Sequence, residues 1–188
     1  MAAGTPRLCD GHVLLDALTR ADAAAHWAGE DDEHARRFGW YPRRSSLEQV
    51  EAYLDHVEAS WRGADGRRAW AIRDPATTTL QGGCEVRLQG DGTAQLSWWV
   101  FPPFRRQGIA SRAVRLVCDY AFGTFGLHRL EAFIAPDNLA SRGVARNAGF
   151  AEMEAVHEGE QLMLRYVLRR PDVPANPATA GPDAARTS

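Results

Sequence analysis

The chain of 188 residues contains no lysine, so arginine supplies all 22 of its basic side chains. Against 24 acidic residues this gives a net charge of −2, which leaves no broad positive field to attract nucleic acid. No apolar run is long enough to cross a membrane, and the N-terminus lacks the pattern of a signal peptide. These absences predict a cytoplasmic protein that binds neither nucleic acid nor membrane.

Cysteine is scarce as well. Cys9, Cys84 and Cys118 are far apart in the sequence and odd in number. They match neither a disulfide framework nor the paired spacing of a metal site. We therefore expect reduced thiols and no bound metal.

Length and composition indicate one domain. At 188 residues with 45% hydrophobic content, the chain can bury one substantial core and is too short to favour two. We expect this domain at residues 10–170, after a loose N-terminus at 1–9. The tail at 171–188 cannot contribute to a core, so it is expected to be disordered.

Periodicity and turn residues predict alternating strands and helices. The expected elements are a strand at 11–18, a short helix through 23–27 after a capping box at Thr19 and Asp22, a helix from 47 after Ser45 and Ser46, strands at 68–73 and 80–88, a hairpin turn at 90–92, a strand ending near 101, a helix from 109, a strand at 128–135, a helix at 138–147 and a hairpin of strands at 150–157 and 161–168. Gly82 and Gly83 predict a β-bulge in the second of the paired strands.

The segment 95–115 is the centre of the sequence. Leu96, Trp98 and Val100 alternate with other residues, as in a strand, and prolines at 102–103 end it. A helix that begins after Gly108 presents backbone N–H groups without partners in the helix, and these groups bind phosphate. The segment therefore predicts a ligand that carries a pyrophosphate.

Residues 105–110 (RRQGIA) resemble the R/Q-x-x-G-x-G/A acetyl-coenzyme A signature of the GCN5-related N-acetyltransferases (GNAT). A second match downstream, Asn138 and Ser141 followed by residues 147–150 (NAGF), is similar to the RimJ/RimL-like branch of that family. The resemblance covers about residues 10–168. It implies a single α/β domain with a mixed, mostly antiparallel sheet splayed at its centre and flanked by about four helices.

The resemblance also implies a coenzyme site. Its pyrophosphate is expected on the helix start and its pantetheine arm along the central strand, where a backbone N–H would stabilise the oxyanion. The residues expected to bind acetyl-coenzyme A are Trp99, Val100, Phe101, Arg105, Arg106, Gln107, Gly108, Ile109, Ala110, Ser111, Asn138 and Ser141. For Asn138 and Ser141 helix capping is the competing interpretation.

The expected catalytic residues are Ser141, near the thioester sulfur, and Glu85. Many family members carry a tyrosine acid where this sequence has Ala145, so Ser141 or water would take that role. Related sequences often carry a glutamate where Gln95 stands here, which leaves Glu85 as the nearest base. His26, His34 and His56 lie on the acceptor side, where surface positions are expected for them.

The acceptor side is expected at residues 27–41 and around the hairpin at 158–161, with Trp27, Phe38, Trp40 and Tyr41 as substrate-binding residues. The leading hypothesis is acetyl transfer from acetyl-coenzyme A to an N-terminal α-amine of a protein or peptide. A small-molecule acceptor and a catalytically weak acyl-coenzyme A-binding module stay open as alternatives. A homodimer also stays open.

Overall fold

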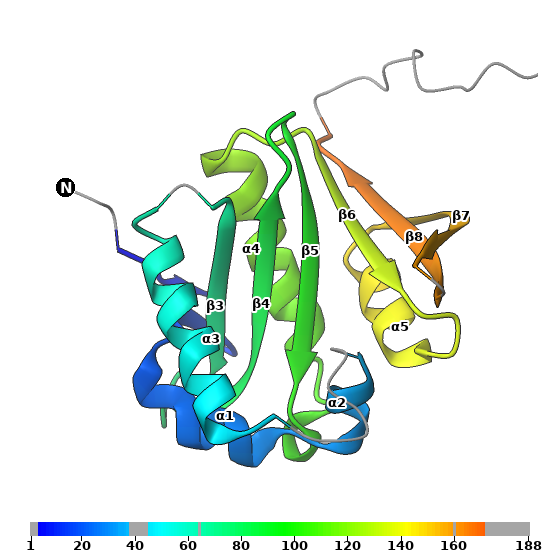
Figure 1. Cartoon of the computed structure of the whole chain (residues 1–188). Helices are drawn as coiled ribbons and strands as arrows, with labels where there is room; N and C mark the ends of the chain where they lie inside the picture. The colour runs from blue at the N-terminus through cyan, green and yellow to red at the C-terminus, as the bar shows by residue number, and fades with distance from the viewer. Residues whose placement is uncertain (1–3, 38–44, 64, 160, 172–188) are drawn as a thin grey trace, which may run out of the picture.

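Eight strands form one sheet in the computed structural model, which describes residues 4–37, 45–63, 65–159 and 161–171 (Figure 1). The strands are β1 (Leu8–Cys9), β2 (Leu14–Ala17), β3 (Arg67–Arg73), β4 (Leu80–Leu88), β5 (Thr93–Val100), β6 (Arg129–Ile134), β7 (Ala151–Glu158) and β8 (Gln161–Arg169). Their spatial order is β1-β2-β3-β4-β5-β6-β8-β7. The sheet thus begins inside the segment 1–9 that was expected to be loose.

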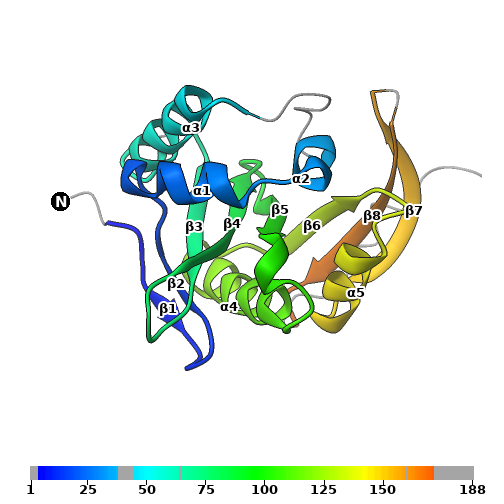
Figure 2. The same cartoon turned by 90° about the horizontal axis from the view of Figure 1, so that it is seen from below.

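Helices cover both faces of the sheet (Figure 2). They are α1 (Ala23–Gly29), α2 (Asp32–Arg37), α3 (Leu47–Ser60), α4 (Ile109–Thr124) and α5 (Leu139–Asn147), with short 3₁₀ turns η1 (Arg20–Asp22) and η2 (Pro102–Phe104). α1, α2 and α3 lie on one face, and α4 and α5 lie on the other. None of the helices in the described ranges has both the length and the apolarity that a membrane span requires.

Each face has its own core. Alternation along β3 sends Trp70 and Ile72 into the cluster under α4, and Ala69 and Ala71 into the cluster under α3. The side facing α3 is lined with alanine, so α3 can pack close to the strand. The expected capping box of α3 is present, since the Ser46 N–H donates to Gln49 Oε1 at 2.8 Å.

The sheet is mixed and splays at its centre, as expected. β5 and β6 are parallel, and they pair only at residues 93–95 with 129–131. Beyond these pairs the strands diverge (Figure 1). All other neighbouring strands are antiparallel.

Gly82 and Gly83 have a packing role. The bulge expected there is centred one residue earlier, because Ile72 pairs with Gly82 and Arg73 pairs with Leu80, which leaves Gln81 as the extra residue. A Cβ on Gly82 would lie 2.1 Å from the Trp99 carbonyl oxygen, and one on Gly83 would lie 2.2 Å from the Trp99 indole. The two glycines therefore let β5 and its tryptophan lie directly against β4.

Candidate active site

The turn from β5 into α4 has the geometry of an anion site. Gly108 is the N-cap of α4, with φ at 77°, a conformation that favours glycine. Buried Ile109 anchors the first turn in the core. The N–H groups of the first turn, residues 109–111, have no partner within the helix, and they combine with the positive end of the helix dipole. Donors of this kind at a helix start are suited to a phosphate.

Arg105 and Arg106 differ in their surroundings. Arg105 donates from Nε to the Val100 carbonyl at 2.9 Å and from Nη1 to Asp31 at 2.8 Å and Glu33 at 3.1 Å. Burial opposes ionisation of Asp31, but hydrogen bonds from Arg105 and a backbone N–H outweigh it and lower the pKa of Asp31. Arg105 therefore ties α2 to the end of β5, and exposed Arg106 is the arginine directed to solvent beside Gly108.

The backbone of Val100 faces the splay between β5 and β6. The Phe101 N–H donates to the Gln81 carbonyl on the β4 side at 2.9 Å. Because the direction of backbone groups alternates along a strand, the N–H and C=O of Val100 point away from β4. Of the expected segment 99–101, Val100 thus offers an N–H to a ligand in the splay, whereas Trp99 and Phe101 direct theirs to β4.

Asn138 and Ser141 lie across the splay, at the start of α5. The Ser141 N–H donates to Asn138 Oδ1 at 3.1 Å, so Asn138 caps the helix. The cap uses only the amide oxygen, which leaves the amide N–H groups for a ligand. Arg37 of α2 pairs with Asp137 at 2.9 Å, so α2 is joined to this side of the splay as well. Ala145 is fully buried, so no hydroxyl stands at that position.

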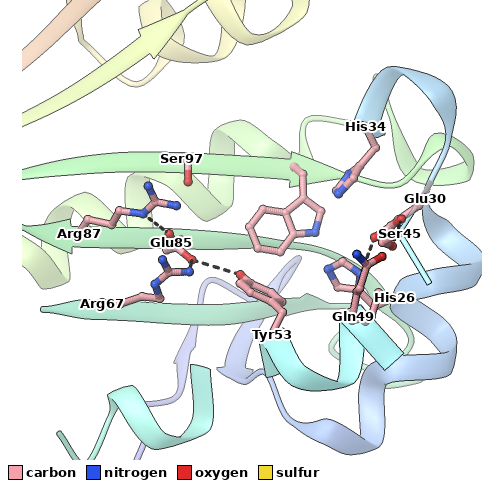
Figure 3. A pocket seen from close by; sticks show the side chains of 12 residues that line it. His26, Glu30, His34, Ser45, Gln49, Tyr53, Arg67, Glu85, Arg87 and Ser97 are labelled. Atoms are coloured by element: carbon pink, nitrogen blue, oxygen red, sulfur yellow. Dashed lines mark hydrogen bonds and ion pairs between the residues drawn. The ribbon is translucent and has the colours of Figure 1, made fainter. Parts of the chain in front are cut away.

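A cavity of about 180 Å³ lies on the opposite face, between the sheet and α1, α2 and α3 (Figure 3). Its lining residues come from six elements and the segments beside them: His26, Glu30, His34, Ser45, Gln49, Val50, Tyr53, Arg67, Glu85, Arg87, Ser97 and Trp99. Trp99 is one of these lining residues, and it directly precedes Val100, which faces the splay. The cavity and the splay therefore meet at one strand end.

Glu85 is buried at this cavity, contrary to the usual solvated position of a strand glutamate. It accepts hydrogen bonds from Tyr53 Oη and Arg67 Nη1, both at 3.2 Å, and from Arg87 Nε at 2.5 Å. Burial, together with the neighbouring carboxylate, raises the pKa of Tyr53, so its hydroxyl stays protonated and donates. Both Glu85 oxygens accept hydrogen bonds, so Glu85 holds the side chains of Tyr53, Arg67 and Arg87 in place.

His26 and His34 are buried at 5% and 8% exposure, so the surface positions expected for them are wrong. His26 Nδ1 lies 3.4 Å from Glu30 Oε1, and Ser45 Oγ donates to Glu30 Oε2 at 2.5 Å. Both imidazole rings lie against Trp99, with centroids at 5.9 and 6.3 Å. His56 is exposed and pairs with an aspartate, as expected of a surface histidine.

Burial sets the ionisation of this cluster. It lowers the pKa of His34 to about 4, and the attraction of Glu30 offsets this only in part, so His34 is neutral near pH 7. Burial also opposes ionisation of Glu30, but the close approach of His26 and the hydrogen bond from Ser45 outweigh it and lower the pKa of Glu30. A carboxylate beside a buried imidazole is the arrangement that holds a histidine as a proton acceptor.

The expected acceptor residues are only partly placed. Trp27 is 46% exposed, lies outside the cavity lining, and donates from Nε1 to the Ser45 carbonyl at 2.8 Å. Phe38, Trp40 and Tyr41 lie outside the described residues. Glu158 of the hairpin lines a separate hollow with Gln95 and Glu131.

Sequence reasoning missed several residues that line the cavity. His26 of α1 and Glu30, the C-cap of that helix, stand four residues apart, and Tyr53 continues the buried stripe of Val50 and Val57. These spacings could have indicated an inward-facing group. Arg67 and Arg87 carried no such signal, because only the strand register brings them together.

Comparison with known proteins identifies the family. A protein-family model described as an acetyltransferase (GNAT) domain matches residues 12–151. The chain belongs to this family. It is 28% identical over 147 residues to the uncharacterized N-acetyltransferase YoaA of Bacillus subtilis, which covers 77% of this chain and 82% of YoaA.

Solved GNAT structures share the fold. RimL, described as a ribosomal-protein α-N-acetyltransferase in complex with coenzyme A, superposes with a TM-score of 0.74 at 16% identity, covering 87% of this chain and 98% of RimL. A spermidine N-acetyltransferase (SpeG) chimera from Vibrio cholerae and hSSAT gives 0.67 at 17% identity, covering 84% of this chain and 95% of that one. The expected GNAT architecture, with RimL-type neighbours, is thereby confirmed, and five α-helices in the described ranges take the place of about four.

Proposed function

We propose that this GNAT acetyltransferase moves an acetyl group from acetyl-coenzyme A to an N-terminal α-amine of a protein or peptide, by direct attack in a ternary complex. The observation that carries the proposal is the meeting of two sites at the end of β5. The Val100 N–H faces the splay, and the neighbouring Trp99 lines the cavity that contains the His26–Glu30 pair. Donor and acceptor would approach the same strand end from opposite faces.

On the donor side, the residues fit acetyl-coenzyme A. The pyrophosphate would lie on the N–H groups of 109–111 beside Gly108, with Arg106 adding charge and Gln107 and Ser111 flanking. The pantetheine arm would lie in the splay, between Val100 and the amide N–H groups of Asn138. The Val100 N–H would stabilise the negative charge that develops on the thioester oxygen.

On the acceptor side, an ammonium must lose a proton before it can attack. We assign this step to His26, held by Glu30, in place of the Glu85 expected from the sequence, because both Glu85 oxygens already accept hydrogen bonds. The free amine then forms the C–N bond as the C–S bond breaks. The second amine proton passes to the departing thiolate, with Ser141 positioned to assist. Tyr53 and Trp99, which both line the cavity, would confine the acceptor.

The names of the structural neighbours support acceptors of two kinds, a ribosomal protein and spermidine. We favour a peptide terminus because two arginines line the cavity, and they would repel a polyamine. A small amino compound is the second candidate, since about 180 Å³ holds only a few heavy atoms. A coenzyme-binding module without chemistry is the third, and the buried His26–Glu30 pair argues against it.

Thermal unfolding with and without acetyl-coenzyme A tests the donor site, with adenosine diphosphate as the control. At about 100 times the dissociation constant, the ligand should stabilise the fold by about 2.7 kcal/mol. For a domain of this size the melting temperature should rise by roughly 5–11 °C. A larger shift with acetyl-coenzyme A than with the nucleotide supports both the turn and the splay. No shift at saturating ligand would contradict the proposal.

Release of the coenzyme thiol over a panel of amines then tests the acceptor. Preference for peptides over spermidine and amino sugars supports the leading candidate. The reverse preference favours a small-molecule acceptor. Coenzyme binding without turnover of any amine favours the binding module.

A further inference from the structure

The acceptor cavity has opposite charge at its two ends (Figure 3). At one end, Arg67 and Arg87 stand directly opposite each other on β3 and β4, and Glu85 accepts a hydrogen bond from each. Guanidinium groups are always charged in proteins. Two such groups against one carboxylate leave one positive charge at this end.

The other end is negative. Glu30 is held as a carboxylate by Ser45 and His26, and burial keeps His34 neutral near pH 7. Glu30 therefore supplies a negative charge at this end of the cavity lining. Figure 3 shows Tyr53 between the two ends, and Trp99 lines the same cavity, so water screens the two charges from each other poorly.

Strand register sets the distance between the ends. Glu85 pairs with Ser97 of β5, and His26 contacts the rings of Trp99 and Phe101, which follow Ser97 in the chain by two and four residues. Two strand residues advance about 7 Å, so the ends lie about 7–13 Å apart. A molecule with an amine and an acid a few bonds apart fits this span with one hydrogen bond at each end.

We infer that the acceptor is a primary amine that also carries a carboxylate. Its ammonium would face His26 and Glu30, and its carboxylate would face Arg67 and Arg87, whose planar forks match carboxylate geometry. This inference rests on the proposed acetyl transfer and narrows its substrate. The carboxylate is either that of a free amino acid or an acidic side chain near the start of a peptide, since half-exposed Arg87 leaves its end open to a continuing chain.

Matched acceptors on the wild-type protein test the inference and identify the source of the acid. One pair is alanine and alaninamide, and the other is alanyl-glutamate and alanyl-glutamine with amidated C-termini, with spermidine as a cationic reference. A charged hydrogen bond contributes about 1.5–3 kcal/mol. In the pair whose acid reaches the two arginines, the acidic member should therefore have a kcat/KM about 10- to 150-fold higher than its amide. Equal rates within both pairs, or spermidine as the best acceptor, would overturn the inference.

Variants of the two arginines test whether they cause the preference for the acid over the amide. Arg87→Gln should lower the acid-to-amide ratio at least about threefold, because one of the two forks is lost. Arg62→Gln, at an exposed arginine after α3, should leave the ratio unchanged. Arg67→Gln would leave buried Glu85 with one donor fewer, so Arg67→Lys is measured beside it, with the melting temperature of every variant. An unchanged ratio in folded Arg87→Gln and Arg67→Lys would contradict this assignment.

Failure of the proposed function looks different. In that case acetyl-coenzyme A binds but no acceptor is turned over. Calorimetric titration of the acid and amide members into the protein–acetyl-coenzyme A complex then decides the inference on its own. Tighter binding of the acid supports it, and equal or weaker binding overturns it.

Discussion

The proposed coenzyme site and the proposed acceptor site of this protein are built in different ways. The turn from β5 to α4 is one continuous stretch, and the groups proposed to bind the pyrophosphate are backbone N–H groups fixed by a strand end, a glycine and a helix start. The acceptor cavity collects side chains from α1, α2, α3, β3, β4 and β5. Changes in cavity side chains can therefore alter the acceptor while the fold and the donor site stay the same.

The largest expected effect is a loss of activity that leaves coenzyme binding unchanged. His26→Gln removes the proposed proton acceptor, so kcat/KM should fall about 100-fold or more at pH 7, while the coenzyme thermal shift stays unchanged. The loss should shrink as pH rises toward the pKa of the acceptor amine, because the substrate then arrives deprotonated. Steady-state rates across pH measure this.

The control for that experiment is His56→Gln at the exposed histidine of α3. Its rate and pH profile should match the wild type. Full activity of His26→Gln at every pH would remove His26 from the mechanism and return Glu85 as the candidate base.

The second effect is on stability. Burial holds the pKa of His34 at about 4, against 6.5 ordinarily, so between these values the unfolded chain binds a proton that the native chain does not. Stability should therefore be complete above pH 6.5 and fall as pH drops toward 4, by on the order of 3 kcal/mol. Glu30 and Asp31 attract the proton to His34, whereas His26 and Arg105 oppose it.

Denaturant unfolding at pH 7 and pH 5 measures this difference. His34→Gln should reduce the loss between the two values, and His56→Gln should keep it. Glu30 and Asp31 have pKa values below their ordinary values of 4.5 and 3.8. The stability that these two carboxylates contribute is therefore lost only below pH 4.5 and pH 3.8, outside the interval from pH 7 to pH 5. An equal loss in wild type and His34→Gln would contradict the buried neutral histidine.

The third effect tests the close contact between Gly83 and Trp99, which lines the cavity. Gly83→Ala places a Cβ 2.2 Å from the Trp99 indole, which must move toward the acceptor. We expect a loss of about 1–3 kcal/mol in unfolding free energy and a higher acceptor KM, with coenzyme binding retained. Gly123→Ala is the matched control, because no described atom outside its chain neighbours and the nearby backbone of its own helix lies within 4 Å of its added Cβ. Equal stability of the two variants would show that Trp99 does not rest on Gly83.

The smallest effect lies on the coenzyme side. Arg106→Gln should weaken coenzyme binding about twofold to fivefold, and less at high salt, because its exposed charge acts through solvent. Arg105→Gln should instead lower the melting temperature, because it releases Asp31, Glu33 and the Val100 carbonyl. The reverse pattern would exchange the roles of the two arginines.

The sequence predicted the parts that depend on local chemistry. Prolines 102–103 ended the central strand, Gly108 began the helix, and the capping residues at 46 and 138 began two more. It did not predict the burial of His26, His34 or Glu85, because burial depends on which face a neighbouring element covers. Nor could it predict the meeting of Arg67 and Arg87, because a shift of one residue in the β3–β4 register would send one of them to the other face.

The limited pairing of β5 with β6 has a consequence for how the molecule opens. Only residues 93–95 and 129–131 join the two halves of the sheet by parallel pairing, and packing beneath α4 carries the rest of the connection. Such a seam divides a sheet into two cooperative units that can lose amide protection at different rates. A ligand that hydrogen-bonds to both edges of the seam would join these units, so the substrate that the enzyme consumes would also hold its two halves together during each turnover.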